Sequence, residues 1–178
     1  MVATPIQDTV QLAIETTGRT GSIALLQGEQ ILYQVNLDPN LRTAASLAPQ
    51  VDQILRSCEQ DGRTVGLIAI ADGPGSFTGL RIGVTTAKTL AYALDLPLVA
   101  VDSLAAIAAA ALHEVVDASS IQVAIDAYRG QVFHGEFVRD QLLADINNIP
   151  DNWTAHPDSV KVLSAEEWTQ IASGFPDG

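Results

Sequence analysis

The sequence Gly73-Pro74-Gly75-Ser76-Phe77-Thr78-Gly79-Leu80-Arg81 lies between the apolar run 67–71 and a stretch with apolar residues at helical spacing. This arrangement predicts a buried strand, a tight loop and a helix whose N-cap is Thr78. Glycine permits a sharp turn and the close approach of another backbone or of an anion. The loop is therefore expected to serve packing, with anion binding as the weaker alternative.

Better-known glycine-rich motifs do not fit this loop. A Walker A loop needs a lysine after Gly79, and a dinucleotide fingerprint needs glycine in place of Thr78. A nucleophile elbow needs glycine at Pro74 and Thr78, so Ser76 between them is a poor candidate nucleophile. The weak cofactor-binding candidates in the loop are Gly73, Gly75 and Ser76.

The composition is that of a folded, acidic protein. Of the 178 residues 47% are hydrophobic, and the formal net charge is −12. A nucleic-acid backbone would repel such a chain unless another subunit supplied positive charge. No apolar run reaches the roughly 18 residues of a membrane span, no secretory signal is recognisable, and Cys58 is the only cysteine. We therefore expect a cytoplasmic protein that binds no membrane.

Strands and helices alternate over the first hundred residues. Strands are predicted at 10–14, 22–26, 31–35, 67–71 and 97–101, and helices at 46–58 and 78–94. In the first helix Ser46 is the expected N-cap, with Pro49 in the first turn. The expected core stripe of the second helix contains Leu80, Val84, Ala87, Ala91 and Leu94.

The same order then begins again. The expected elements are a helix capped by Ser103, strands at 121–126 and 131–138, a loop at 147–152, and a final helix with the capping box Ser164 and Glu167. Asp126 ends its strand as Glu15 ends the first strand of the chain. This duplication predicts an α/β protein with a first lobe at residues 1–101 and a second, smaller lobe at 102–178.

Three segments together resemble the TsaB (YeaZ) family: Ile14-Glu15-Thr16-Thr17, the loop 73–81, and residues 125–132. The resemblance runs from about residue 10 to about residue 172. It implies the actin-like ATPase (ASKHA, ribonuclease H-like) fold, with two lobes that each hold a mixed sheet in a β-β-β-α-β-α-type layout. Family members continue past the segment that matches 160–172. The second lobe is therefore expected to be abbreviated, as a short natural version or through C-terminal truncation.

The resemblance implies assembly rather than catalysis. TsaB is the non-catalytic partner of the transferase TsaD, which makes N6-threonylcarbamoyladenosine (t6A) at position 37 of tRNA, and it supports recruitment of the ATPase TsaE. We further expect that the chain contacts tRNA only through the complex and forms a homodimer when TsaD is absent. The candidate cofactor is ATP or ADP, bound at the partner interface.

No metal site is expected. The first helix of TsaD carries two metal-binding histidines four residues apart, whereas residues 41–51 of this chain contain no histidine. His113, His134 and His156 are scattered without the spacing of metal ligands, so each is expected to be a surface or structural residue.

An independent nucleotide hydrolase or kinase of the same fold is the alternative function. Actin-like ATPases hold magnesium with carboxylates at the ends of the two lobes' first strands, and Glu15 and Asp126 occupy those places. The bulky loop after Asp126 argues against a phosphate cradle, and capping of their own loops is the simpler role for both carboxylates. A serine peptidase or metallopeptidase has almost no support, because this sequence shows neither a recognisable Ser/His/Asp triad nor a metal site.

The two helices of the first lobe carry the partner-binding hypothesis. Beside the stripes that should face the sheet, small and aliphatic residues lie on a second face, where two helices of a partner would complete a four-helix interface. An ordinary solvated face is the competing interpretation. The predicted interface residues are Ala44, Ala45, Ala48, Pro49, Arg81, Ile82, Thr85, Lys88 and Thr89.

Overall fold

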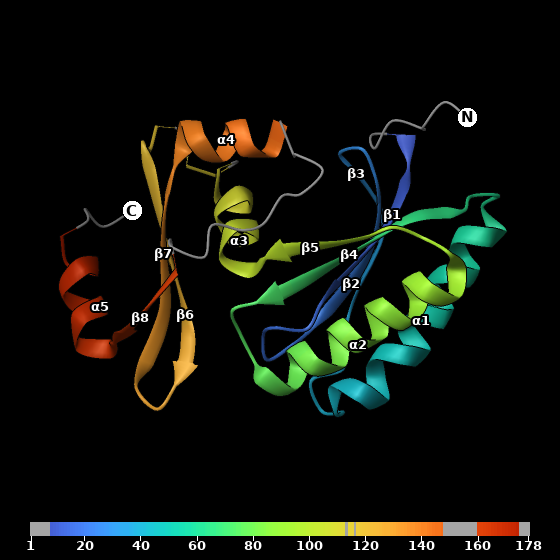
Figure 1. Cartoon of the computed structure of the whole chain (residues 1–178), viewed down its shortest axis with the longest axis horizontal. Helices are drawn as coiled ribbons and strands as arrows, with labels where there is room; N and C mark the ends of the chain where they lie inside the picture. The colour runs from blue at the N-terminus through green and yellow to red at the C-terminus, as the bar shows by residue number, and fades with distance from the viewer. Residues whose placement is uncertain (1–7, 113, 116, 148–159, 175–178) are drawn as a thin grey trace. The chain divides into compact units, whose positions relative to one another are not determined.

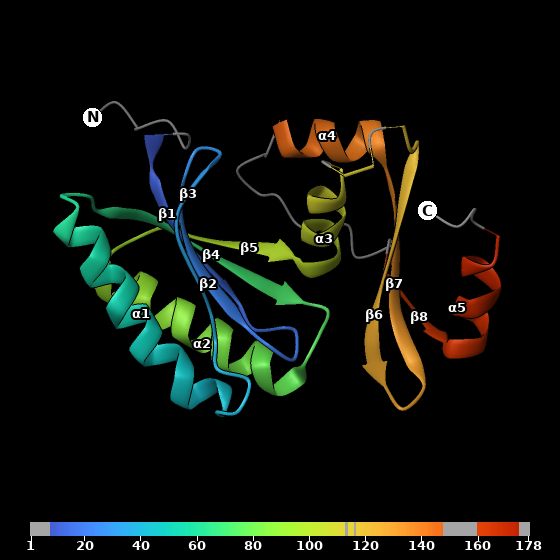
Figure 2. The ribbon, with the colours of Figure 1, turned by 180° about the vertical axis from the view of Figure 1, so that it is seen from behind.

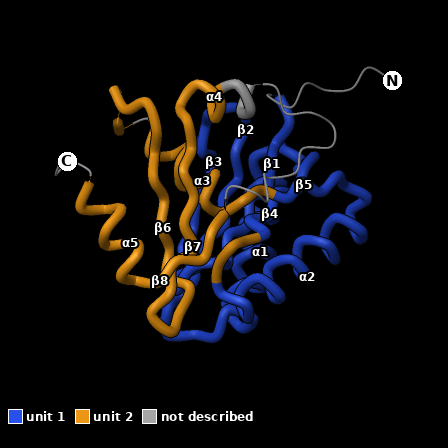
Figure 3. The backbone as a smooth tube through the Cα atoms, turned by 60° about the vertical axis from the view of Figure 1, so that its left-hand side comes forward, with its two compact units in different colours: residues 1–72, 76–100 blue, residues 73–75, 101–178 orange. Residues whose placement is uncertain are grey.

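The computed structural model describes residues 8–112, 114–115, 117–147 and 160–174 (Figures 1 and 2). These residues form two compact units, one of residues 8–72 and 76–100, the other of 73–75 with the described residues from 101 onward (Figure 3). The elements are β1 (Val10–Glu15), β2 (Ser22–Gln27), β3 (Gln30–Asn36), α1 (Thr43–Gln60), β4 (Val65–Gly73), α2 (Phe77–Leu94), β5 (Leu98–Asp102), α3 (Ser103–Ala111), β6 (Ser120–Tyr128), β7 (Gln131–Val138), α4 (Arg139–Asn147), β8 (Val160–Ser164) and α5 (Ala165–Ala172).

A five-stranded mixed sheet with the order β3-β2-β1-β4-β5 forms the first unit. β1 pairs antiparallel with β2 and parallel with β4, and β2 pairs antiparallel with β3. The predicted order of three strands, a helix, a strand, a helix and a strand is confirmed. This connectivity places the end of β1 beside the end of β4, where the glycine-rich loop begins.

The core of the first unit lies between this sheet and two helices. Burial alternates along β1, where Leu12 and Ile14 are buried and their neighbours are half-buried, as expected for a strand with one face in the core. α1 and α2 contribute to the same cluster of buried side chains. Both lie side by side over the sheet in Figures 1 and 2.

All three N-caps predicted for the earlier helices are wrong. α1 begins at Thr43, so Ser46 lies inside the helix, where its hydroxyl accepts a hydrogen bond from the Asp38 N–H at 3.2 Å. Pro49 consequently lies in the helix interior rather than in its first turn. The side chains that cap α2 and α3 are those of Ser76 and Asp102, in place of Thr78 and Ser103.

The buried face of α2 also differs from the predicted stripe. Its buried residues are Gly79, Gly83, Ala87 and Ala91, so only the two alanines of the expected stripe are fully buried. Leu80 and Val84 are half-buried, and the prediction is wrong for Leu94, which is 46% exposed.

The second unit is built on the antiparallel sheet β6-β7-β8. One face of this sheet packs on α3 and α4 through a cluster that contains Leu104, Val123 and Leu142. The capping box of Ser164 and Glu167 at α5 is confirmed. Neither α4 nor β8 was predicted from the sequence, and the loop expected at 147–152 lies outside the described residues except for Asn147, which ends α4.

Candidate functional site

The turn after β1 is joined tightly to the N-terminus of α2. The hydroxyl of Thr16, whose side chain is almost completely buried, donates a hydrogen bond of 2.9 Å to the Gly79 carbonyl. The Ser76 N–H donates to the carbonyl of Thr17 at 2.7 Å, and the Ser76 hydroxyl accepts from the Gly79 N–H at 3.3 Å. Ser76 therefore acts as a helix cap, and its geometry gives no support to a nucleophilic role.

Two glycines are needed for this junction. A Cβ added at Gly79 would lie 1.9 Å from the Thr16 carbonyl oxygen, and one at Gly83 would lie 2.1 Å from the Thr16 hydroxyl oxygen. Any side chain at either position would force α2 away from β1. The sequence favoured a packing role for the glycine-rich loop. The contacts of Gly79 and Gly83 support close packing at the start of α2, the helix that follows this loop.

The Glu15 carboxylate closes the turn that follows it. Its Oε1 atom accepts hydrogen bonds from the backbone N–H and the hydroxyl of Thr17, and from the Gly18 N–H at 3.2 Å. In a phosphate-binding loop these backbone N–H groups would point to the ligand's oxygens. Here a carboxylate already occupies them, so the residues of this turn do not fit a nucleotide phosphate.

Asp126 has the equivalent role in the second unit. Its Oδ1 atom accepts a hydrogen bond of 2.7 Å from the Tyr128 N–H. Tyr128, Arg129 and Gly130 have φ values of 66°, 56° and 73°, so three consecutive residues adopt the left-handed conformation where β6 turns into β7. Each of the two candidate carboxylates thus caps the loop of its own unit.

His134, the one described histidine, is a structural residue of the second unit. Its Nε2 lies 2.6 Å from Gln122 Oε1, and its ring centroid is 5.4 Å from that of Trp168. Burial lowers the pKa of His134 and raises the pKa of the Cys58 thiol. His113 and His156 lie outside the described residues.

Neither a metal centre nor a membrane span is found in the described part of the chain. Within residues 8–112, 114–115, 117–147 and 160–174, no three His, Cys, Asp or Glu side chains are grouped so as to hold a metal ion. None of the helices described there has the length and apolar character required to cross a membrane.

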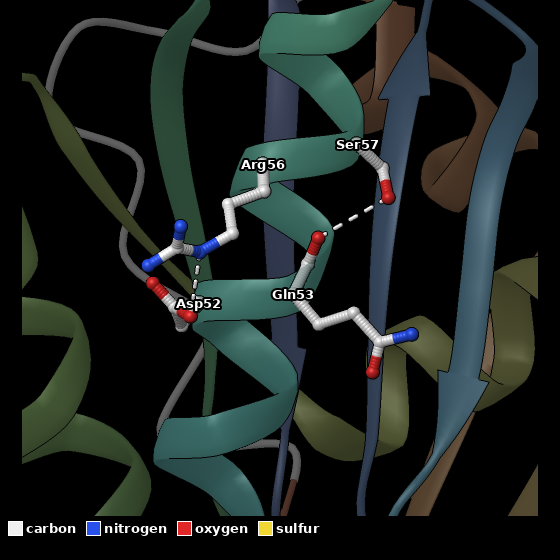
Figure 4. Close-up of polar contacts among 4 residues, drawn as sticks. All are labelled: Asp52, Gln53, Arg56 and Ser57. Atoms are coloured by element: carbon white, nitrogen blue, oxygen red, sulfur yellow. Dashed lines mark hydrogen bonds and ion pairs between the residues drawn. The ribbon is translucent and has the colours of Figure 1, made fainter.

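The predicted interface residues lie mostly on the outer faces of α1 and α2. Ile82 is half-buried against the core. The remaining eight are exposed: Ala44, Ala45, Ala48, Pro49, Arg81, Thr85, Lys88 and Thr89. The C-terminal half of α1 forms its own polar contacts, since Arg56 pairs with Asp52 at 2.8 Å and the Ser57 hydroxyl donates to the Gln53 carbonyl at 3.2 Å (Figure 4).

Two aromatic residues of α2 were not predicted to lie on this surface. Phe77 is 66% exposed and Tyr92 is 91% exposed. The guanidinium carbon of Arg81 lies 3.9 Å from the centroid of the Phe77 ring, a cation–π contact. The spacing of positions 77, 81, 85, 88 and 92 follows one side of a helix, and that pattern could have identified both aromatic residues.

Several known proteins are similar to this chain in sequence and in fold. A family model described as TsaD, tRNA N6-adenosine threonylcarbamoyltransferase, matches residues 42–152. The tRNA threonylcarbamoyladenosine biosynthesis protein TsaB of Bacillus subtilis (strain 168) is 36% identical over 147 residues, which cover 80% of this chain and 63% of that protein. TsaB of Escherichia coli (strain K12) is 35% identical over 130 residues, 73% of this chain and 55% of that protein. The structure of YeaZ from Pseudomonas aeruginosa matches with a TM-score of 0.62 and 27% identity over 88% of this chain and 65% of that chain.

The order of elements, the tight strand–loop–helix junction and these matches define an α/β protein of the actin-like ATPase (ASKHA) fold class. Within that class the chain belongs to the TsaB (YeaZ) family of proteins related to TsaD. It spans about three-fifths of the length of the TsaB relatives described above.

Proposed function

We propose that this chain is a non-catalytic scaffold and activating subunit for t6A synthesis at position 37 of tRNA. In this proposal it binds a TsaD-type transferase in the cytoplasm, supports recruitment of TsaE, and meets tRNA only through the complex. The observation that carries the proposal is the pair of exposed outer faces on α1 and α2 in a chain whose relatives are t6A biosynthesis proteins. The same faces would form a homodimer when the partner is absent.

The outer face of α1 is suited to close helix packing. Ala44, Ala45, Ala48 and Pro49 form a small, uncharged surface at the N-terminal end of the helix. Small side chains allow the backbones of two helices to approach closely, and the core of a protein interface is depleted of charge. The next charged side chains of α1, Asp52 and Arg56, form an ion pair with each other (Figure 4).

A structural role for both candidate catalytic carboxylates supports the non-catalytic assignment. Glu15 accepts three hydrogen bonds from the turn that would otherwise hold a phosphate, and Asp126 accepts one from its own hairpin turn. A hydrolase would need these groups free for a metal ion or a water molecule. Nucleotide turnover by the purified chain that Asp126→Ala abolishes would contradict this part of the proposal.

Size-exclusion chromatography with light scattering tests the assembly. The chain is run alone and mixed at micromolar concentration with the TsaD-type protein of the same organism, and a one-to-one complex is expected. Ala48→Asp should abolish the complex, because it places a charge in the α1 surface. Ala106→Asp makes the same change at an exposed position of α3 and should leave the complex intact. Failure of the parent chain to bind would refute the proposed function.

A further inference from the structure

Resting on the proposed function, we propose that α2 selects an acidic face of a different protein in preference to a second copy of this chain. The selecting surface is a stripe of exposed residues, named here the α2 stripe: Phe77, Arg81, Thr85, Lys88 and Tyr92. Arg81, held against Phe77, is the specificity-determining residue of this stripe.

Helix geometry makes these five residues a continuous surface. At about 100° per residue, positions 77, 81, 85, 88 and 92 fall within an arc of roughly 80°. The 15 steps from Phe77 to Tyr92 extend about 22 Å along the axis. This face is well separated from the buried one, which begins with Gly79 and Gly83.

Large aromatic side chains at both ends of the stripe are an unusual use of exposed surface. Tyr92 is 91% exposed and Phe77 is 66% exposed, although both belong to a regular helix whose inner face is in the core. Tyrosine and arginine are enriched among the residues that dominate protein–protein binding energies. The α2 stripe contains one of each, with a second aromatic ring beneath the arginine.

The charge of α2 has the opposite sign to that of the chain. The sequence has 21 acidic and 9 basic residues, yet Phe77–Leu94 contains Arg81 and Lys88 and no acid. The ion pairs seen among the described residues, Arg56–Asp52 and Arg63–Asp61, include neither cation of the α2 stripe. Carboxylates on a partner would supply complementary charge.

The contact with Phe77 prepares Arg81 for this role. A guanidinium that lies over an aromatic ring keeps the N–H groups at its edge available to a carboxylate, which it can bind through two parallel hydrogen bonds. Because the ring already restricts the side chain, less conformational entropy is lost when the partner binds. Lysine could not reproduce both the stacking and the two-point contact.

Two other occupants fit the stripe less well. A two-fold pairing of α2 with α2 of a second copy would bring each cation towards its equivalent, and such like-charge contacts are unfavourable. Nucleic acid would meet two cations on a chain whose net charge is −12, too few to overcome the repulsion. A protein face with carboxylates opposite Arg81 and Lys88, and with apolar surface opposite the rings at the two ends, satisfies both the charges and the aromatic rings.

The test measures two affinities of the same variants: for the TsaD-type protein by calorimetry, and for self-association by light scattering. Arg81→Glu should raise the dissociation constant of the mixed complex at least about 30-fold without weakening the homodimer. The dissociation constant of Arg81→Gln should lie between those of Arg81→Glu and the parent chain. Tyr92→Ser should raise the dissociation constant of the mixed complex about 10-fold. Arg129→Glu changes the net charge equally at an exposed hairpin residue and should alter it less than about 3-fold.

Each remaining outcome overturns the proposal. If Arg81→Glu binds the partner as the parent chain does while Ala48→Asp does not, the selecting role fails and the proposed function stands. If Arg81→Glu weakens the homodimer as much as the mixed complex, the stripe does not distinguish the two partners. A loss confined to tRNA binding would identify nucleic acid as the occupant. Absence of any complex with the parent chain refutes both proposals together.

Discussion

Replacement of Gly79 by alanine tests the junction between β1 and α2 most directly. Van der Waals contact needs about 3.5 Å, whereas the new Cβ would lie 1.9 Å from the Thr16 carbonyl oxygen. Relief of this overlap requires a separation of roughly 1.5 Å between two packed elements. Overpacking of this kind costs about 1–3 kcal/mol, and loss of the Thr16–Gly79 hydrogen bond costs about 1 kcal/mol. The better helix propensity of alanine returns about 1 kcal/mol.

The net expectation for Gly79→Ala is therefore a loss of about 2 kcal/mol, or a fall in Tm of roughly 4–8 °C for a chain of this size. Circular dichroism during thermal and urea unfolding measures it. Gly18→Ala is the matched control, because the nearest atom to its added Cβ is 3.7 Å away. That variant should be neutral or slightly stabilising, since alanine restricts the unfolded chain.

A second substitution, at Thr16, distinguishes the effect of Gly79→Ala from that of Gly83→Ala. The overlap at Gly83 is with the Thr16 hydroxyl oxygen, which Thr16→Ala removes, while the overlap at Gly79 is with a backbone atom, which it leaves in place. In the Thr16→Ala background, Gly83→Ala should cost much less than in the parent chain, because the contacts that remain, with Ile70 Cδ1 at 3.2 Å and with the Cβ of residue 16 at 3.3 Å, are far milder. Gly79→Ala should still cost at least about 1 kcal/mol. If Thr16→Ala rescued both variants alike, or if Gly79→Ala were as harmless as Gly18→Ala, the close-packing account would be wrong.

Two further predictions concern protonation in the second unit and at its first helix. Burial lowers the pKa of His134 below its usual value of about 6.5, so the unfolded chain takes up the proton first. Stability should fall as pH drops below about 7, and His134→Gln should flatten this dependence of stability on pH. Urea unfolding at several pH values, followed by the fluorescence of Trp168 in a Trp153→Phe background, measures it. Burial raises the pKa of Asp102, so the native state holds the proton of this carboxyl more tightly than the unfolded chain does. The contribution of Asp102 to the free energy of unfolding is therefore lost as the pH rises through its pKa in the folded state. Asp102→Asn keeps an acceptor for the Ala105 N–H and should match or exceed the parent's stability near neutral pH, whereas Asp102→Ala should cost about 1 kcal/mol in urea unfolding.

Apart from β8, the strands of both units were predictable because their apolar residues alternate or form short continuous runs. The inner face of α2 was not, for a physical reason. A hydrophobic stripe at helical spacing identifies the core face only when large side chains fill the gap between helix and sheet. Here the helix approaches β1 so closely that Gly79 and Gly83 line the contact, and glycine has no hydrophobic signal. Leu94 was assigned to the core by the same rule, although it is 46% exposed at the end of the helix.

Sequence patterns were weakest where elements bury little. Of the α4 residues whose burial is described, only Leu142 is buried, and in the edge strand β8 Val162 is 54% exposed. The two candidate carboxylates show a different limit. Glu15 ends β1 as predicted, whereas β6 continues past Asp126 to Tyr128. Whether the two carboxylates face a ligand or their own loops depends on the direction of backbone N–H groups, which no residue pattern specifies.

The two faces of α2 depend on each other. Gly79 and Gly83 bring the first part of the helix against Thr16 in the turn after β1. Burial of Ala87 and Ala91 on the same face extends the packed contact along the helix and fixes its axis and its rotation. A fixed rotation is what allows Phe77, Arg81 and Tyr92 to present one outward surface without loop closure or refolding on binding. The turn after β1 is rigid for a related reason, since the Glu15 carboxylate occupies its N–H groups. A loop that binds nucleotide must leave those groups open, whereas a scaffold gains from closing them. The same strand–loop–helix junction can therefore serve catalysis or assembly, and the hydrogen bonds of Glu15 are one of the grounds for the assembly role proposed above.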